Sequence, residues 1–362
     1  MSFTLWVTSD CNLKCKYCYE GEKNTIKMNK KIVDDAINFG MKNFMKENEE
    51  KTFCIHGGEP FLEFDTIKYI VERIKYLCKD EKPTFLTTTN ATILNDEILD
   101  FIINEMPDIT VSLDGNKNIH DLNRVFISGK GSHDIALKNS LCLLEHLPNI
   151  RVRMTFNTKI VASLFESVKY LIEKGFKVIV PAPDLFDKNW NYSHIKSLKE
   201  QILLIKEYTK DKEDLLISII DNTYTKKCNC KGGVNSVHIY PDGKLYPCIL
   251  TGGIEEFCIG NIYDGINLDK VNYLEEISKQ KNPSCVGCEI YNYCDGSRCK
   301  IINKLINDNY LIPSAMLCNI ENLKYDLIYS IKVIACMFNL KERLIWKKIR
   351  NLKLKRYKIK RK

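Results

Sequence analysis

Cys11-Asn-Leu-Lys-Cys15-Lys-Tyr-Cys18 is the stretch that decides how the rest of the chain is interpreted. Its Cys-x3-Cys-x2-Cys spacing brings three thiols together within eight residues, directly after an apolar segment, 3–8, that is typical of a buried strand. Four cysteines saturate a cubane iron–sulfur cluster, so a set of three leaves one iron free to bind another ligand. The pattern predicts a strand followed by a loop that holds such a cluster.

A structural zinc ion is the alternative for the same three cysteines. Zinc occupies closed sites with four ligands, usually supplied by paired Cys-x2–4-Cys knuckles. Here the cysteines form a triplet, and neither a fourth cysteine nor a histidine lies near it in the sequence. The spacing therefore favours an iron–sulfur cluster over zinc.

Length and composition restrict the classes of protein that the chain can represent. Its 362 residues suffice for one large domain and a smaller one. No segment is long and apolar enough to cross a bilayer, and a strand-like segment begins within two residues of Met1, so we expect no targeting peptide. The 16 cysteines, in clustered spacings, then indicate metal ligands in a reducing cytoplasm.

The net charge of +8 is concentrated at the C-terminal end. Residues 341–362 hold twelve Lys or Arg and one Glu, whereas the other 340 residues carry a net charge of −3. The near-neutral remainder does not predict a nucleic-acid groove. The apolar stretch 327–340 suits a packed helix, and the basic tail after it indicates contact with an anionic lipid surface or an acidic peptide, or a solvated chain end.

Strand-like and helix-like segments alternate from residue 3 to about residue 218. We expect Asp65 and Asn95 to start helices, Gly175 to end one, and a long helix at about 194–216. The predicted strands are 3–8, 52–56, 84–89, 109–113, 151–156 and 177–180, the last of them closed by Pro181 and Pro183. Six β–α units in series predict parallel strands with helices outside.

Two more motifs follow predicted strands. Gly57-Gly58-Glu59-Pro60 ends the second strand, and Ser112-Leu-Asp114-Gly115 with His120-Asp121-Leu-Asn-Arg124 follows the fourth. Together with the triplet they resemble the radical SAM family, in which S-adenosylmethionine (SAM) occupies the open iron of a [4Fe–4S] cluster. The resemblance implies a partial (β/α)6 barrel with its active site at the carboxyl ends of the strands.

The resemblance also implies contacts to SAM. The glycine-rich run would receive the amino group, and Ser112 and Arg124 the carboxylate, which a guanidinium matches bidentately. Thr89 and Asn90 could reach the ribose, and Asn157 is a weaker candidate. The alternatives are an ordinary turn for the glycines and a surface ion pair for Arg124, and we expect His56 to be a core histidine. The predicted cofactor-binding set is Gly57, Gly58, Glu59, Pro60, Thr89, Asn90, Ser112, Asp114, Arg124 and Asn157.

Apolar periodicity fades between about 226 and 320, where cysteines and glycines are frequent, so metal must help this segment to fold. Its cysteine spacing resembles the SPASM extension of radical SAM enzymes, which holds two auxiliary [4Fe–4S] clusters. The family has three residues between its third and fourth clustered cysteines and this chain has four, which leaves the pairing of Cys299 open. Two structural zinc ions are the alternative.

The resemblance implies that the first auxiliary cluster is held by Cys230, Cys248, Cys299 and Cys228; without Cys228 this cluster has an open iron. It implies that the second is held by Cys285, Cys288, Cys294 and Cys318. With Cys11, Cys15 and Cys18 these are the predicted metal ligands. We expect Cys258 not to bind metal, and Cys54, Cys78, Cys142 and Cys336 to be small core residues.

The predicted fold is α/β: a partial (β/α)6 TIM-like barrel at 1–222, a small auxiliary-cluster domain at 223–322, and an apolar helix with a basic tail at 323–362. The predicted activity is reductive cleavage of SAM to a 5′-deoxyadenosyl radical that oxidatively modifies or crosslinks a peptide or protein, as in ribosomal peptide maturases. No catalytic base is assigned.

Three alternatives to this function stay open. The first is an oxidase of protein residues like the anaerobic sulfatase maturases, which carry an Asp directly after the cysteine that matches Cys248; Ile249 stands there in this chain, against that reading. The others are a radical SAM enzyme acting on a small molecule and a non-catalytic zinc-binding module. Expected partners are a peptide or protein substrate, a separate leader-peptide-binding protein, a one-electron donor such as flavodoxin or ferredoxin, and a membrane surface at the tail, with no nucleic acid.

Overall fold

The computed structural model describes residues 2–21, 25–45, 51–79, 81–221, 227–294 and 298–337. Its centre is a sheet in the order β7-β6-β5-β4-β3-β2-β1-β8-β9, and every pair is parallel except β8–β9. The strands are β1 (Ser2–Thr8), β2 (Thr52–Gly57), β3 (Thr84–Thr89), β4 (Asp108–Ser112), β5 (Arg151–Phe156), β6 (Val178–Pro183), β7 (Leu216–Ile217), β8 (Ser236–Ile239) and β9 (Leu245–Tyr246).

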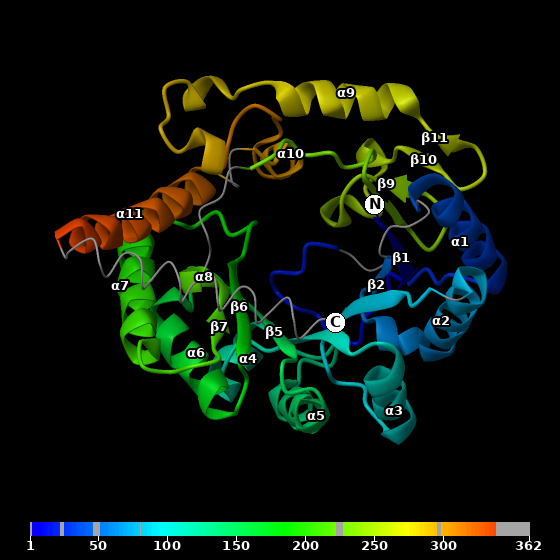
Figure 1. Ribbon diagram of the computed structural model, residues 1–362, viewed down its shortest axis with the longest axis horizontal. Helices are drawn as coiled ribbons and strands as arrows, with labels where there is room; N and C mark the ends of the chain where they lie inside the picture. The colour runs from blue at the N-terminus through cyan, green and yellow to red at the C-terminus, as the bar shows by residue number, and fades with distance from the viewer. Residues whose placement is uncertain are drawn as a thin grey trace.

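Helices cover the outer face of this sheet, and α9 (Leu268–Lys279) and α10 (Lys300–Asn307) lie across its top in Figure 1. The helices of the first part are α1 (Lys30–Phe44), α2 (Phe64–Cys78), α3 (Asp96–Glu105), α4 (Lys117–Asn123), α5 (His133–His146), α6 (Leu164–Glu173), α7 (Tyr192–Thr209) and α8 (Ser218–Asp221). The series of β–α units with parallel, sequential strands confirms the predicted barrel architecture.

The two faces of each strand differ in burial because side chains alternate across a sheet. On β2, Phe53 and Ile55 are fully buried against the helices, whereas Cys54 and His56 lie half-buried on the inner face. Burial of each such large apolar side chain stabilises the fold by about 1.5–3 kcal/mol. On β1, Phe3 packs so closely on α1 that a Cβ at Gly40 would lie 2.6 Å from its ring, so only glycine fits there.

The sixth strand differs from the prediction at its end. Pro181 and Pro183 lie inside β6, opposite Met154 and Phe156 of β5, and do not close it. On its other side β6 pairs with β7 only at Val178 and Ile179. The segment with the prolines is therefore an edge, where a missing N–H costs no ladder hydrogen bond.

Two helix predictions also need correction, and one helix was missed. The predicted helix at 194–216 ends at Thr209, and Leu216–Ile217 form β7 instead. Asp65 does not cap α2, because the 3-10 turn η1 (Pro60–Glu63) leads straight into that helix and leaves Asp65 in its first turn. The short helix α4 was not predicted. Asn95 caps α3 as expected, with its side chain accepting a hydrogen bond from the backbone N–H of Ile98.

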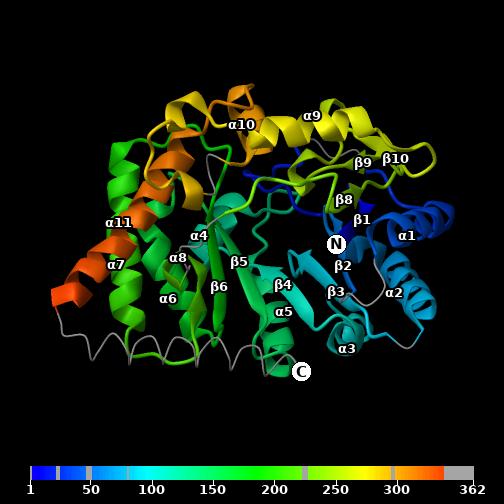
Figure 2. The same cartoon turned by 45° about the horizontal axis from the view of Figure 1, so that its top comes forward.

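The C-terminal region continues the sheet. β8 pairs in parallel with β1, so one sheet runs across the predicted domain boundary near residue 222. The remaining elements are β10 (Gly260–Asn261), β11 (Gly265–Ile266), α9 (Leu268–Lys279), α10 (Lys300–Asn307) and α11 (Ala315–Met337), with α9 and α10 above the strands in Figure 2. α11 begins before the predicted boundary at 323.

The described part of the chain holds no helix that combines the length and the apolar character needed to cross a bilayer. The predicted basic tail, 341–362, lies outside the described residues, as does the end of the apolar stretch that precedes it.

Candidate active site

The predicted site residues converge at one edge of the sheet, because they follow the carboxyl ends of neighbouring parallel strands. The triplet loop after β1 is hydrogen-bonded to the loop after β4, with the N–H groups of Lys14 and Lys16 donating to the carbonyls of Val125 and Asn123 at 2.7 and 3.0 Å. The turn after β2 joins the same loop, since the Glu59 N–H donates to the Asp10 carbonyl at 2.8 Å.

The two glycines after β2 are required by contact within the protein itself. A Cβ at Gly57 would lie 2.8 Å from the carbonyl oxygen of Thr8, and one at Gly58 would lie 2.2 Å from that of Asp10. Real Cβ atoms do not approach backbone oxygens so closely, so a side chain would push the turn away from the triplet loop. The sequence pattern predicted that the backbone of these glycines lies close to a ligand. In the structure their backbone also lies close to the residues that lead into the triplet loop.

Glu59 lies at the centre of a buried hydrogen-bond network. Its carboxylate accepts hydrogen bonds from Thr89 Oγ1 and the Asn90 N–H, both at 2.7 Å, and from the Phe61 N–H at 3.2 Å. Burial raises the pKa of Glu59 to about 7, although these three hydrogen bonds act in the opposite direction. The network fixes the ends of β2 and β3 relative to each other.

Cys11 is the most buried of the three triplet thiols, and two N–H groups point at it. Leu13 N–H lies 3.4 Å from its Sγ, and Asn90 Nδ2 lies 3.8 Å away. Cys15 and Cys18 are half-buried. Within the described ranges, no three His, Cys, Asp or Glu side chains converge so as to hold a single metal ion. A cubane cluster instead binds each cysteine to a different iron, and a donor set of three thiols with N–H groups aimed at one sulfur fits that chemistry.

Arg124 and Asp114 form a buried ion pair beneath the triplet loop. Arg124 Nε lies 3.2 Å from Asp114 Oδ2, and the phenol of Tyr17 donates to the same oxygen. The guanidinium also lies over the Tyr17 ring, 5.2 Å from its centroid. Burial acts to lower the pKa of Arg124, but Asp114, Tyr17 and Cys15 together outweigh this and raise it above its ordinary value, so the cation persists. Arg124 is therefore neither exposed nor in a surface ion pair.

His120 of α4 orients the backbone next to Arg124. The Asp114 N–H donates to His120 Nδ1 at 3.4 Å, so the other ring nitrogen carries the proton and donates to Ser132 Oγ at 3.0 Å. Ser132 in turn donates to the Arg124 carbonyl at 2.7 Å. Burial lowers the pKa of His120 to about 3, so the ring is neutral at ordinary pH.

The other predicted SAM contacts lie at the same edge. Ser112 and Thr89 are buried at the ends of β4 and β3. Asn157 follows β5, and its Nδ2 donates to Asn123 Oδ1 at 3.4 Å. Pro60 opens η1 directly after the glycines.

His56 was expected to be a satisfied core histidine, and it has partners. Its Nε2 lies 2.9 Å from the Tyr19 hydroxyl, and its ring lies 4.9 Å from that of Trp6. The ring is half-buried on the inner face of β2. Sequence reasoning did not find the pairing with Tyr19, since 37 residues separate the two side chains.

Asp184 and Phe186 were missed by the sequence analysis. They follow β6 and line a small cavity of about 200 Å³ together with Lys16, Tyr17, Cys18, Tyr19 and Gly21 of the triplet loop. The position of Asp184, a polar residue directly after a strand, was the sequence signal that could have found this cavity.

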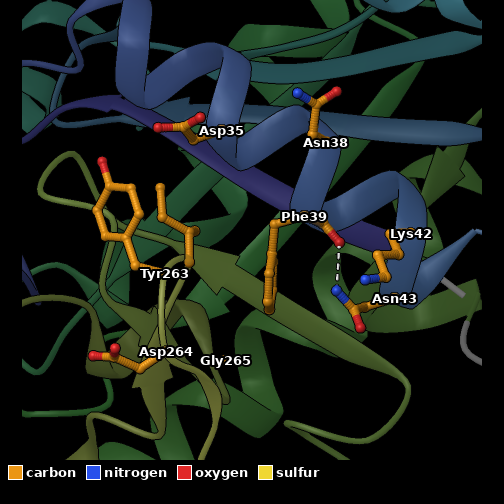
Figure 3. A pocket seen from close by; sticks show the side chains of 9 residues that line it. Asp35, Asn38, Phe39, Lys42, Asn43, Tyr263, Asp264 and Gly265 are labelled. Carbon is orange, nitrogen blue, oxygen red and sulfur yellow. Dashed lines mark hydrogen bonds between the residues drawn. The ribbon is translucent and has the colours of Figure 1, made fainter.

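A larger cleft, about 510 Å³, lies outside the barrel between α1 and the β10–β11 turn, where Phe39 and Tyr263 face it (Figure 3). No predicted site residue lines that cleft.

The later cysteines form two groups. Burial raises the pKa of the Cys299 thiol to about 12, and the nearby Cys248 and Cys230 thiols add to this. The pKa of Cys318 is likewise raised by burial first and then by Cys294, Cys285 and Cys288. Cys228 is exposed, and Cys258 is buried with its Sγ directed at the Gly260 carbonyl. The structure thus brings Cys230, Cys248 and Cys299 together, and Cys285, Cys288, Cys294 and Cys318 together, while their role as metal ligands stays a prediction.

The second group also has polar side chains directed at sulfur. Asn282 Nδ2 lies 3.9 Å from Cys285 Sγ, and Lys300, whose side chain is buried, donates to Asn282 Oδ1. Asn322 Nδ2 lies 3.6 Å from Cys318 Sγ. Burial lowers the pKa of Lys300, while Cys285 acts against this shift.

Comparison with known proteins agrees with this geometry. A family described as a 4Fe-4S single cluster domain matches residues 1–136. The fold is shared with the solved structure of anSMEcpe with bound AdoMet and Kp18Cys peptide, with a TM-score of 0.74, 20% identity, and coverage of 92% of this chain and 98% of that one. The segment matched by this family contains the Cys11, Cys15 and Cys18 triplet, and the likeness to the solved structure shows the fold of the chain.

The chain is also similar in sequence to two named proteins. It is 28% identical over 321 residues to the antilisterial bacteriocin subtilosin biosynthesis protein AlbA of Bacillus subtilis, covering 83% of this chain and 67% of the relative. It is 26% identical over 322 residues to the cysteine-type anaerobic sulfatase-maturating enzyme of Clostridium novyi, covering 79% and 84%.

Proposed function

We propose that this chain cleaves SAM reductively and uses the resulting radical to oxidise or crosslink residues of a peptide or protein. The observation that carries the proposal is the division of the cysteines into a triplet at the carboxyl edge of the sheet and two further groups. One relative makes the bacteriocin subtilosin and another matures sulfatases, so peptide or protein substrates are common to both.

Cys11, Cys15 and Cys18 would hold a [4Fe–4S] cluster, which supplies one electron to the sulfonium of SAM when both are bound. The chain's own task is to orient SAM and exclude water. The backbone of Gly57–Pro60 would take its amino group, and Ser112 its carboxylate. Arg124 meets Asp114 through Nε, so its terminal amino groups would serve that carboxylate. Thr89, Asn90 and Asn157 stay predicted contacts.

The auxiliary groups would hold two further clusters next to the substrate. Cys230, Cys248 and Cys299 lie together, whereas Cys228 is exposed, so the first auxiliary cluster would have an iron open to a substrate thiolate if Cys228 stays unbound. Ile249 follows Cys248 and begins the 3-10 turn η3 (Ile249–Thr251), in the position of the sulfatase branch's acidic residue. This favours peptide crosslinking over the sulfatase-maturase type of oxidation.

We place the reaction in the cytoplasm, with a barrel at 1–222, an auxiliary-cluster domain at 223–322 and a tail. A separate leader-peptide-binding protein would present the substrate, and flavodoxin or ferredoxin would supply electrons. The basic tail would serve for peripheral membrane contact.

Anaerobic reconstitution tests the proposal. The protein should take up about twelve iron atoms and as much sulfide, enough for three cubane clusters. With SAM and dithionite it should release 5′-deoxyadenosine, and more with a cysteine-containing peptide encoded beside its gene. Zinc near two per chain without sulfide would support a non-catalytic module. Turnover with small molecules and none with peptides would contradict a peptide or protein substrate and indicate a radical SAM enzyme that acts on a small molecule.

A further inference from the structure

The side-chain amide of Asn90 is held against the cysteine triplet by its own hydrogen bonds. Its Nδ2 lies 2.8 Å from Asn12 Oδ1 and 3.8 Å from Cys11 Sγ, and all three residues belong to the junction between the triplet loop and the end of β3. Asn90 is only 7% exposed. A buried NH2 group needs hydrogen-bond acceptors, and the acceptors within reach of Asn90 Nδ2 are Asn12 Oδ1 and Cys11 Sγ.

The orientation of this amide follows from its neighbours. Asn90 Oδ1 lies 2.9 Å from the Thr92 N–H, a group that can only donate. The oxygen must therefore face Thr92, and the NH2 group must face Cys11 and Asn12. Thr92 Oγ1 strengthens this arrangement, since it donates to Asn90 Oδ1 at 2.6 Å and accepts from Asn12 Nδ2 at 2.8 Å.

The backbone of Asn90 is fixed as well. Its N–H donates to Glu59 Oε2 at 2.7 Å, and Glu59 is held by Thr89 and Phe61. The turn after β2 thus anchors the residue after β3, and that residue directs a donor at the first cysteine of the triplet. The sequence analysis gave Asn90 as a residue that could reach the ribose of SAM, whereas its hydrogen bonds direct the amide at the sulfur of Cys11.

We propose that Asn90 is a positioning residue that donates an N–H hydrogen bond to Cys11 Sγ and thereby raises the reduction potential of the cluster held by the triplet. An added electron places more negative charge on the sulfur ligands, so a donor aimed at one of them stabilises the reduced form more than the oxidised form. The Leu13 N–H, 3.4 Å from the same sulfur, acts in the same sense. The inference rests on the proposed function, because it concerns the cluster that reduces SAM.

An EPR-monitored redox titration of the reconstituted full chain tests the inference, without SAM in the cell. The signal of the triplet cluster is assigned beforehand by its change when SAM is added. Asn90→Ala should reduce the ratio of reduced to oxidised cluster at a fixed solution potential by roughly threefold to tenfold, as for the loss of one charge-assisted hydrogen bond. Asn90→Asp should reduce it further, since it turns a carboxylate oxygen toward the thiolate.

Asn157→Ala is the matched control, because Asn157 also follows a parallel strand and is also 7% exposed. Its midpoint potential should equal that of the wild type. An unchanged potential in both Asn90 variants, with weaker SAM binding, would assign Asn90 to the ribose and overturn the inference. Loss of the cluster in both variants but not in Asn157→Ala would also overturn it, as evidence of a purely structural role. A wild-type chain that assembles no cluster at the triplet would instead refute the proposed function itself.

Discussion

Asp114 neutralises Arg124 inside the protein: Asp114 Oδ2 lies 3.2 Å from Arg124 Nε, and neither side chain is more than 9% exposed. Tyr17, from the triplet loop, shares the same carboxylate oxygen. The ion pair thus links the end of β4 to the loop after β1. Its burial makes each partner dependent on the other.

Asp114→Ala should destabilise the metal-free protein by about 3–5 kcal/mol, because it leaves Arg124 as an uncompensated buried charge. Urea unfolding followed by circular dichroism measures the change. Asp35→Ala, which breaks the exposed pair with Lys31 on α1, is the control and should have little effect. Equal effects of the two substitutions would show that the buried pair is not formed in solution.

Glu59 should make stability fall as pH rises. Burial raises its pKa from 4.5 to about 7, so between these values the unfolded chain has released a proton that the folded chain retains. Stability is therefore lost through this window and is constant above it. The difference in unfolding free energy between wild type and Glu59→Gln should decrease by about 3 kcal/mol from pH 4.5 to 7.

Thr89→Val offers a check on the same residue. It removes a hydrogen-bond donor that favours the ionised carboxylate of Glu59, so the pKa of Glu59 in the folded protein should rise further. The pH range over which stability is lost should then extend to higher pH. A pH profile of stability that is the same in wild type and Glu59→Gln would contradict a raised pKa.

The cysteine groups predict a pattern of iron loss. Cys18→Ala, Cys248→Ala and Cys288→Ala should each lose about four iron atoms after reconstitution, because each belongs to a different cluster. Only Cys18→Ala should abolish SAM cleavage outright. Cys258→Ala, at a buried cysteine outside both auxiliary groups, is the control and should keep its iron. Iron and sulfide assays with EPR on each variant measure this, and iron loss in the control would mean that the ligand sets are wrongly assigned.

Gly252 and Trp6 should show coupled effects on stability. A Cβ at Gly252 would lie 2.6 Å from the Trp6 ring, so Gly252→Ala should cost about 1–3 kcal/mol through overpacking. Trp6→Phe opens space, and the double variant should be more stable than the sum of the single effects predicts. Thermal unfolding of the four proteins gives the coupling, and simple additivity would contradict the contact.

The barrel could be predicted because its signals are local. Each of β1 to β5 is a short segment rich in β-branched or apolar residues before turn residues, and segments with helical periodicity separate them. The end of β6 was misjudged because tolerance of Pro181 and Pro183 depends on which side of the strand lacks a partner, a property of the assembled sheet. β7, with two residues, carries too little pattern to be recognised.

The candidate site likewise combines features that local sequence signals predict with features that depend on the folded structure. Residue types and strand ends located the triplet, the glycine-rich turn and the later cysteines, all from motifs within short segments. The roles of these residues stay predictions. The pairing of Arg124 with Asp114, and the turn of Asn90 toward Cys11, depend on side-chain directions that no spacing in the sequence encodes.

The position of β8 beside β1 has a consequence for how the chain can be divided. The strand that delivers the first cysteines is completed on one side by a segment from beyond residue 230. A gene shortened after the last barrel helix would leave the amides of β1 unpaired along one margin and invite self-association. The two halves of the chain therefore depend on each other for a closed sheet margin, and neither is expected to stay monomeric when expressed alone.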